Sequence, residues 1–183
     1  MSPFVFFAPF VVNGFSAEMC PLTPIMNTGT TLRMGDRNDL PAINGVIGRA
    51  VMTWRLPDRV KRLSLPLYRY SETDLGHLEL CVAEDDHGVS GVAAWEPAGP
   101  ADLSEGVRGL LLHGLYVDPG RQRGGIGRQL VGACLSRARE LQLDGVLVKV
   151  QADAEPFFRR LGFDGLPVRD KSRDYALRFW HDA

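Results

Sequence analysis

The chain has 183 residues, of which 45% are hydrophobic and 23% charged, and its formal net charge is −1. Such a length corresponds to about one domain of 100–200 residues, and the composition is that of an ordinary folded domain. A net charge near zero argues against a dedicated nucleic-acid-binding protein and a polybasic membrane module. We therefore expect no nucleic acid and no membrane as partner, although a local basic cluster is compatible with this composition.

The histidines and cysteines of the chain predict neither a metal site nor a disulfide framework. The four histidines are scattered, and Cys20, Cys81 and Cys134 lie far apart without a Cys-x-x-Cys spacing. Free cysteines in this arrangement fit a reducing compartment, so we expect the protein in the cytoplasm.

The first residues differ in composition from the rest of the chain. Five of the nine phenylalanines lie within the first fifteen residues, and the first charged side chain is Glu18. The apolar run at 4–12 is too short to span a membrane and lacks the basic start of a secretory signal. We treat residues 1–29 as an N-terminal extension. It is a disordered arm, the product of a start codon placed before Met26 or Met34, or an arm that packs on the domain or on a partner subunit.

Residues 30–183 are expected to form one domain of strands and helices. The predicted strands are 30–34, 77–85, 89–96, 107–117, 146–150 and 175–180, and the predicted helices run from Asp36 or Asp39 to about Trp54, over 124–141 and over 154–161. Pro57 and Pro66 interrupt the segment after the first helix, so we expect a short helix or irregular chain there. Helices between strands at both ends and hairpins in the middle predict a mixed α/β sheet with helices on both faces.

A glycine-rich turn follows the strand 107–117 and opens the next helix. Gly124, Gly125 and Gly127 have no side chain to keep a ligand away from the backbone. The first amides of a helix lack intrahelical partners and carry partial positive charge. Three arginines add positive charge beside them: Arg121, Arg123 and Arg128. These features predict a site for a diphosphate.

Two common phosphate-binding motifs do not fit this turn. The dinucleotide fingerprint would need a third glycine at Leu130, and the phosphate loop would need a lysine followed by serine or threonine. What is present is Gln122-x-x-Gly125-x-Gly127. Here the chain resembles the GNAT superfamily of N-acetyltransferases, in which this turn holds the diphosphate of acetyl-CoA. The alternative is an ordinary glycine-rich turn before a surface helix.

Other segments share the resemblance. Leu115-Tyr116-Val117-Asp118-Pro119 is similar to the family's fourth strand, whose backbone pairs with the pantetheine arm. The segment 154–163 is similar to the family's Ala-x-x-x-Tyr-x-x-x-Gly-Phe helix and turn, and the hairpin that ends at 91–95 fits its second and third strands. The resemblance extends from Thr30 to Trp180 and implies a GNAT-like mixed, largely antiparallel central sheet with helices on both faces.

The resemblance also implies acetyl-CoA as the acyl donor and a set of residues that bind it. These are Leu115, Tyr116, Val117, Gln122, Arg123, Gly124, Gly125, Ile126, Gly127, Arg128, Gln151 and Phe158. Three positions depart from the family pattern. Phe158 stands where many members have a tyrosine that protonates the leaving thiolate, Gln151 where an asparagine often contacts the cofactor, and Leu111 where some members place a catalytic glutamate.

His113 is the candidate general base. An alkyl ammonium with a pKa near 10.4 must lose a proton before its nitrogen can attack, and an imidazole with a pKa near 6.5 can accept it at neutral pH. Regular alternation places His113 on the same strand face as Leu111. The alternative role is a buried structural histidine. Cys81 and Cys134 fall on apolar faces and are expected to pack in the core rather than carry an acyl group.

The resemblance implies an acyl-CoA-dependent N-acyltransferase that moves acetyl to a primary amine by direct attack in a ternary complex. Its acceptor is a small-molecule or peptide amine that the sequence does not identify, and a homodimer is one form that the sequence allows. A non-catalytic acyl-CoA-binding or regulatory domain and a nucleotide-binding module unrelated to CoA are the alternatives.

The segment 55–69 is locally basic. It carries Arg55, Arg59, Lys61, Arg62 and Arg69 against the single acidic residue Asp58. One hypothesis is that this patch favours an acceptor with a carboxylate or phosphate, and the other is that it forms a solvated helix face.

Overall fold

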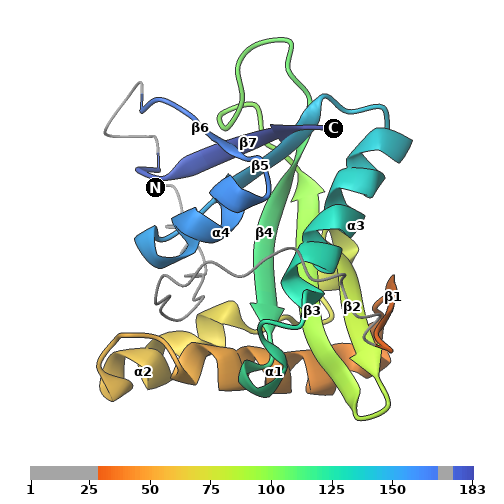
Figure 1. The fold of residues 1–183 in the computed structure, drawn as a ribbon, viewed down its shortest axis with the longest axis vertical. Helices are drawn as coiled ribbons and strands as arrows, with labels where there is room; N and C mark the ends of the chain where they lie inside the picture. Colours follow the sequence, from red (N-terminus) through yellow and green to blue (C-terminus); the bar gives the residue numbers. More distant parts are fainter. Residues whose placement is uncertain (1–28, 169–174) are drawn as a thin grey trace, which may run out of the picture.

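A single seven-stranded sheet organises the chain. The computed structural model describes residues 29–168 and 175–183, so the predicted N-terminal extension lies outside the described residues except for Gly29. The strands follow the order β1–β2–β3–β4–β5–β7–β6, and neighbouring strands are antiparallel except for the parallel pair β4 and β5 (Figure 1). The predicted mixed, largely antiparallel sheet is confirmed.

Most element bounds lie within a few residues of the predicted ones. The strands are β1 (Thr31–Met34), β2 (Glu79–Asp85), β3 (Gly88–Pro97), β4 (Gly109–Val117), β5 (Gly145–Lys149), β6 (Asp164–Gly165) and β7 (Arg178–Asp182). The helices are α1 (Leu40–Met52), α2 (Asp58–Tyr68), α3 (Ile126–Glu140) and α4 (Glu155–Arg160). The two-residue strand β6, which pairs with β7, is an element that the sequence pattern does not predict.

Each face of the sheet is covered by helices through its own hydrophobic core. On one face, Leu130 and Cys134 of α3 and Phe158 of α4 pack against Leu112 and Leu115 of β4. On the other face, α1 and the end of α2 pack in a second core that includes Tyr70 and Tyr116. Figure 1 shows α3 and α4 in front of the sheet, and α1 and α2 lying together across one end of the molecule. The expected helices on both faces are therefore present.

Helix α2 is longer and more regular than its two prolines suggest. Pro57 precedes the helix, where a missing backbone N–H costs nothing, while Pro66 lies inside its last turn. Lys61 and Tyr68 are buried on the side toward α1, and the Lys61 ammonium donates to the Met52 carbonyl oxygen at 3.0 Å. These contacts with α1 hold a helix that local propensity alone would not predict.

The packing of α3 on β3 requires a glycine at position 91. A Cβ atom there would lie 2.9 Å from Ile126 Cγ2 and 3.0 Å from Leu130 Cδ1. Because both contacts are closer than van der Waals distance, any side chain at this position would push α3 away from the sheet.

We expect Gly91→Ala to lower the free energy of unfolding by about 1–3 kcal/mol, as overpacking of a filled core usually does. Urea denaturation followed by circular dichroism measures the change. Gly132→Ala, on helix α3, is the matched control. Its Cβ meets nothing within 4 Å, so the better helix propensity of alanine should raise stability by up to about 1 kcal/mol. Equal effects of the two substitutions would contradict this account of the α3–β3 contact.

Candidate active site

Strand β4 leaves its neighbour β5 part way along its length. The parallel pairing joins Gly109–Leu112 of β4 to Gly145–Val148 of β5, whereas β4 continues to Val117. In the described part of the chain, no strand pairs with 113–117 on the side of β5. Buried backbone groups need hydrogen-bond partners, so this edge can offer its amides and carbonyls to a bound ligand.

The glycine-rich turn after β4 presents backbone amides. Gly125 has φ = 85°, a left-handed conformation that favours glycine, and a Cβ there would meet nothing within 4 Å. The Gln129 amide donates to the Gly125 carbonyl oxygen at 3.0 Å. Ile126, Gly127 and Arg128 precede it in the first turn of α3, so their amides have no intrahelical acceptor. Arg123 and Arg128 are exposed beside them. The predicted turn is therefore open, and its amides and arginines fit an anion.

Ion pairs attach this turn to the rest of the domain on two sides. The Arg49 guanidinium of α1 contacts the Asp118 carboxylate at 2.6 Å, and the Arg121 guanidinium lies 3.5 Å from the Asp85 carboxylate at the end of β2. Within the turn, the Gly120 amide donates to Asp118 Oδ1 at 2.9 Å, and Gln122 Nε2 donates to the Val117 carbonyl oxygen at 3.3 Å. The turn thus has its shape before any ligand binds.

His113 lies at a β-bulge. Ala94 of β3 pairs with Gly114, but the next residue, Trp95, pairs with Leu112, so His113 is an extra residue in β4. His113 lies on the α1 side of the sheet, where its ring centroid is 6.4 Å from that of Tyr70. The structure thus places His113 on the same face as Leu111, as alternation predicts, while the bulge turns Gly114 toward that face as well.

Tyr70 is fixed against this bulge. Its backbone N–H donates to Asn44 Oδ1 at 2.9 Å, and its carbonyl oxygen accepts from Asn44 Nδ2 at 2.8 Å. Its hydroxyl packs on Gly114 so closely that a Cβ at that position would collide with it. Burial raises the pKa of Tyr70 well above its ordinary value, so the phenol stays protonated at neutral pH.

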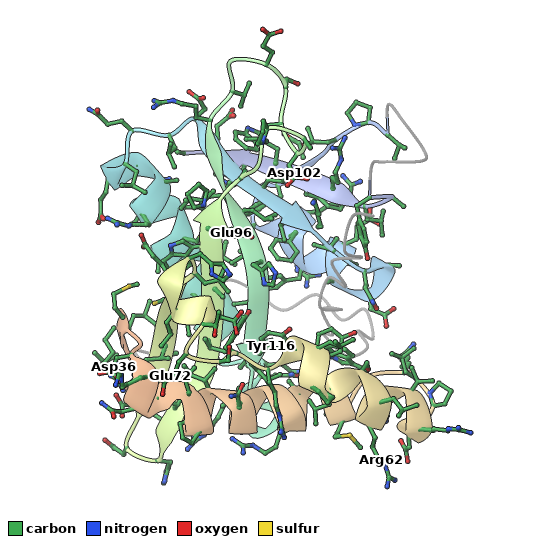
Figure 2. All side chains as sticks on the ribbon, turned by 180° about the vertical axis from the view of Figure 1, so that it is seen from behind. Asp36, Arg62, Glu72, Glu96, Asp102 and Tyr116 are labelled. Atoms are coloured by element: carbon green, nitrogen blue, oxygen red, sulfur yellow. The ribbon has the colours of Figure 1, made fainter. Side chains whose placement is uncertain are left out.

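Glu96 is the nearest carboxylate on the neighbouring strand. It pairs with Leu111, so Glu96 and His113 are diagonal neighbours on one face, within reach of long side chains. Burial lowers the pKa of His113, whereas the charges of Glu96 and Asp74 oppose that shift. Figure 2 shows Glu96 on the side of the sheet that faces α1, with Tyr116 nearer to that helix. The sequence pattern does not place Glu96 or Tyr70 beside His113. Strand register brings Glu96 there, and the hydrogen bonds with Asn44 hold Tyr70 there.

The remaining predicted cofactor residues occupy different surroundings. Leu115 and Tyr116 are buried on opposite faces of β4, and the pKa of the Tyr116 phenol is raised by burial. Val117 and Gln151 are half-buried, and Gln151 follows β5 at the start of the 3-10 turn that precedes α4. The Phe158 side chain lies in the core between the rings of Phe157 and Phe163, at centroid distances of 5.1 and 5.2 Å. It therefore packs and offers no proton, as its chemistry predicts.

The two cysteines of the described chain have raised thiol pKa values. Burial raises the pKa of Cys81 to about 11, and it raises that of Cys134 further because the side chain lies inside the α3 core. A thiol in this state is not a nucleophile at neutral pH. Both cysteines are core residues, as predicted.

A groove of about 660 Å³ lies beside the turn, between α1 and the end of α2. Arg49, Arg69 and Asp118 supply its charged groups, and Gly45 and Gly48 of α1 form part of its wall. Arg69 is the member of the basic segment 55–69 that lines this groove. Within the described residues, no group of three or more His, Cys, Asp or Glu side chains could hold a metal ion. No helix in that part of the chain is long and apolar enough to cross a membrane.

The fold is that of solved acetyltransferases. A PaiA N-acetyltransferase from Thermoplasma acidophilum in complex with coenzyme A superposes with a TM-score of 0.66 at 12% identity, over 84% of this chain and 99% of that one. A GNAT family acetyltransferase from Brucella melitensis in complex with acetyl-CoA gives 0.58 at 22% identity, over 84% and 87%. The ribosomal-protein-S18-alanine N-acetyltransferase from Escherichia coli gives 0.58 at 17% identity, over 84% and 93%.

A family model identifies the same class from the sequence. Residues 76–164, from the start of β2 to β6, match the model described as Acetyltransferase (GNAT) domain. No curated protein sequence matches the chain. This segment therefore matches the GNAT acetyltransferase domain that the glycine turn and its flanking segments predicted.

The contact between Tyr70 and Gly114 can be tested by a double-mutant cycle. We expect Gly114→Ala to destabilise the protein, because the new methyl group collides with the Tyr70 hydroxyl. Tyr70→Phe should relieve part of that loss, giving a coupling of about 0.5–3 kcal/mol in urea denaturation. Additive effects of the two substitutions would show that the hydroxyl does not pack on the bulge.

Proposed function

We propose that the chain is an acyl-CoA-dependent N-acyltransferase that moves acetyl from acetyl-CoA to a primary amine of a small molecule or peptide. The observation that carries this proposal is the open turn at 122–128, which follows directly on β4, and no other described strand pairs with β4 beyond Leu112 on the side of β5. Residues 76–164 match the GNAT acetyltransferase domain, and acyl transfer is the general activity of that family. The neighbours solved with acetyl-CoA or CoA support the same donor here.

The turn and the strand edge divide the binding of the donor between them. The amides of Gly124 to Arg128 and the side chains of Gln122, Arg123 and Arg128 bind the diphosphate. The backbone of Leu115, Tyr116 and Val117 pairs with the pantetheine arm, which leads the thioester toward the bulge at His113. The Gln151 amide lines the other side of this arm, and Phe158 supports that side from within the core, without reaching the surface.

His113 accepts the proton of the incoming ammonium. Its lowered pKa keeps the imidazole neutral at pH 7, so it is ready to act as a base. The neutral nitrogen then attacks the thioester carbon, with a C–N bond forming and the C–S bond breaking. Glu96 stabilises the imidazolium that His113 becomes. Because Phe158 has no hydroxyl to protonate the thiolate sulfur, the His113 imidazolium delivers the first proton to that sulfur, and the second proton lost from nitrogen passes to water.

The second candidate function is a non-catalytic acyl-CoA-binding or regulatory domain. The observation in its favour is that Leu111 and Phe158, both buried and apolar, occupy the two positions where family members place a catalytic acid or base. Thiol release from acetyl-CoA in the presence of amines, amino acids, polyamines and peptides separates the two functions. We expect release with at least one acceptor, and binding without release from any acceptor would favour the second function.

Removing two arginines beside the turn should weaken donor binding. We expect the double substitution Arg123→Ala and Arg128→Ala to lower acetyl-CoA affinity at least about tenfold, because charge-assisted hydrogen bonds to phosphate are lost. Isothermal titration calorimetry measures the affinity, and thermal shift with ATP and NAD tests whether the site is specific for CoA. Arg139→Ala, at the other end of α3, is the control and should bind normally. Unchanged affinity in the double variant would exclude the turn as the diphosphate site.

The pH dependence of kcat tests the proposed role of His113 as general base. We expect His113→Ala to lower kcat at least about tenfold with near-normal acetyl-CoA affinity. Because burial lowers the pKa of His113, the acidic limb of the kcat profile should lie below pH 6.5. Glu96→Gln removes a charge that raises this pKa, so its limb should move to lower pH. Glu84→Gln, on an exposed part of β2, should leave the limb in place. Unchanged turnover in His113→Ala would remove His113 from the mechanism.

A further inference from the structure

Helix α2 exposes an aliphatic stripe that no described part of the chain covers. Val60, Leu63 and Leu67 are 45%, 69% and 61% exposed, and Leu56, in the bend before the helix, is 37% exposed. The spacing i, i+3, i+7 places Val60, Leu63 and Leu67 in one line along α2, and Leu56 extends the apolar surface just before the helix begins. The opposite side of α2, at Lys61, Leu65 and Tyr68, packs toward α1. The helix therefore has two apolar sides, of which only one is buried.

An arginine stripe runs beside the aliphatic one. Arg59 and Arg62 are exposed about one turn apart on α2, and Arg55 is exposed in the bend before the helix. Among the described residues, no carboxylate forms an ion pair with any of the three, because Asp58 pairs with Lys61 at 2.8 Å. Figure 2 shows the Arg62 side chain extending from α2 away from the body of the protein. This surface is positive, although the whole chain has a net charge of −1.

The charge of this surface argues against a second copy of the chain. A twofold dimer through α2 would place the same patch on both sides, so the arginine stripes of the two copies would face each other. A concave protein partner fits less well than a deformable surface, because α2 forms an outer corner of the molecule (Figure 1). A narrow aliphatic stripe with arginines along its flank is instead the pattern of a helix that lies in a lipid interface.

We propose that α2 binds an anionic lipid surface, with Leu56, Val60, Leu63 and Leu67 inserted among the acyl chains and Arg55, Arg59 and Arg62 at the phosphate groups. The binding is peripheral, parallel to the membrane plane. It is independent of the acyltransferase function, since neither stripe includes a residue of the candidate active site. Overall composition predicts no membrane partner, but that expectation concerns the charge of the whole chain and not the arrangement along one helix.

Vesicle co-sedimentation of the full-length chain tests the proposal. We expect binding to vesicles of equal parts phosphatidylcholine and phosphatidylglycerol, little binding to phosphatidylcholine alone, and loss of binding in high salt. Leu63→Asp with Leu67→Asp, and separately Arg59→Glu with Arg62→Glu, should each lower the partition coefficient at least about tenfold. Matched controls are Val107→Asp, at a side chain 39% exposed in the loop before β4, and Arg139→Glu on α3. Both controls should bind normally.

Three results would overturn the proposal. The first is no binding of the wild-type chain to anionic vesicles. The second is equal binding by the stripe variants and the wild type, which would locate the contact elsewhere in the chain. The third is a concentration-dependent dimer, detected by sedimentation velocity without vesicles, that Leu63→Asp abolishes, because the stripe would then be a protein interface. Circular dichroism and the thermal shift with acetyl-CoA establish that each variant is folded.

Discussion

The candidate site depends on the point where β4 and β5 stop pairing. Parallel strands normally satisfy each other's backbone groups along their whole length, but here the ladder ends at Leu112 and Val148. Beyond that point no described strand pairs with β4 on the side of β5, and this stretch starts at the bulge at His113 and leads to the turn that opens α3. One strand therefore presents backbone groups that suit an extended ligand, a titratable side chain and a turn whose amides fit an anion. If β4 were paired along its whole length, it would offer no backbone groups to an extended ligand.

The two faces of the sheet carry different kinds of side chains near the candidate site. The α3 side is apolar up to the turn and holds Phe158 and Cys134 in a core without reactive groups. The α1 side brings Tyr70, Glu96 and His113 together around the bulge, where burial and carboxylate charge act in opposite directions on one imidazole. In the proposed reaction, phosphate binding and proton transfer therefore depend on different packing layers.

The sequence predicts the fold well because its strongest signals are local. The glycine turn, the apolar periodicity of α1 and α3 and the hairpin at 85–88 each specify their own conformation within a few residues. The bulge at His113 depends on cross-strand register, which no local pattern in β4 reveals, and the same register brings Glu96 to the site. Tyr70 reaches the bulge through its hydrogen bonds with Asn44, a contact between segments 26 residues apart. Helix α2 forms despite Pro66 because α1 packs against it.

Helix α1 connects both halves of the proposed reaction. Asn44 holds the Tyr70 backbone beside the bulge, and Arg49, five residues later, holds Asp118 at the start of the phosphate turn. A single helix thus sets the spacing between the proposed diphosphate turn and the bulge that carries the proposed base. In the proposed reaction, the relative placement of donor and amine is therefore fixed by the packing of α1 on the sheet.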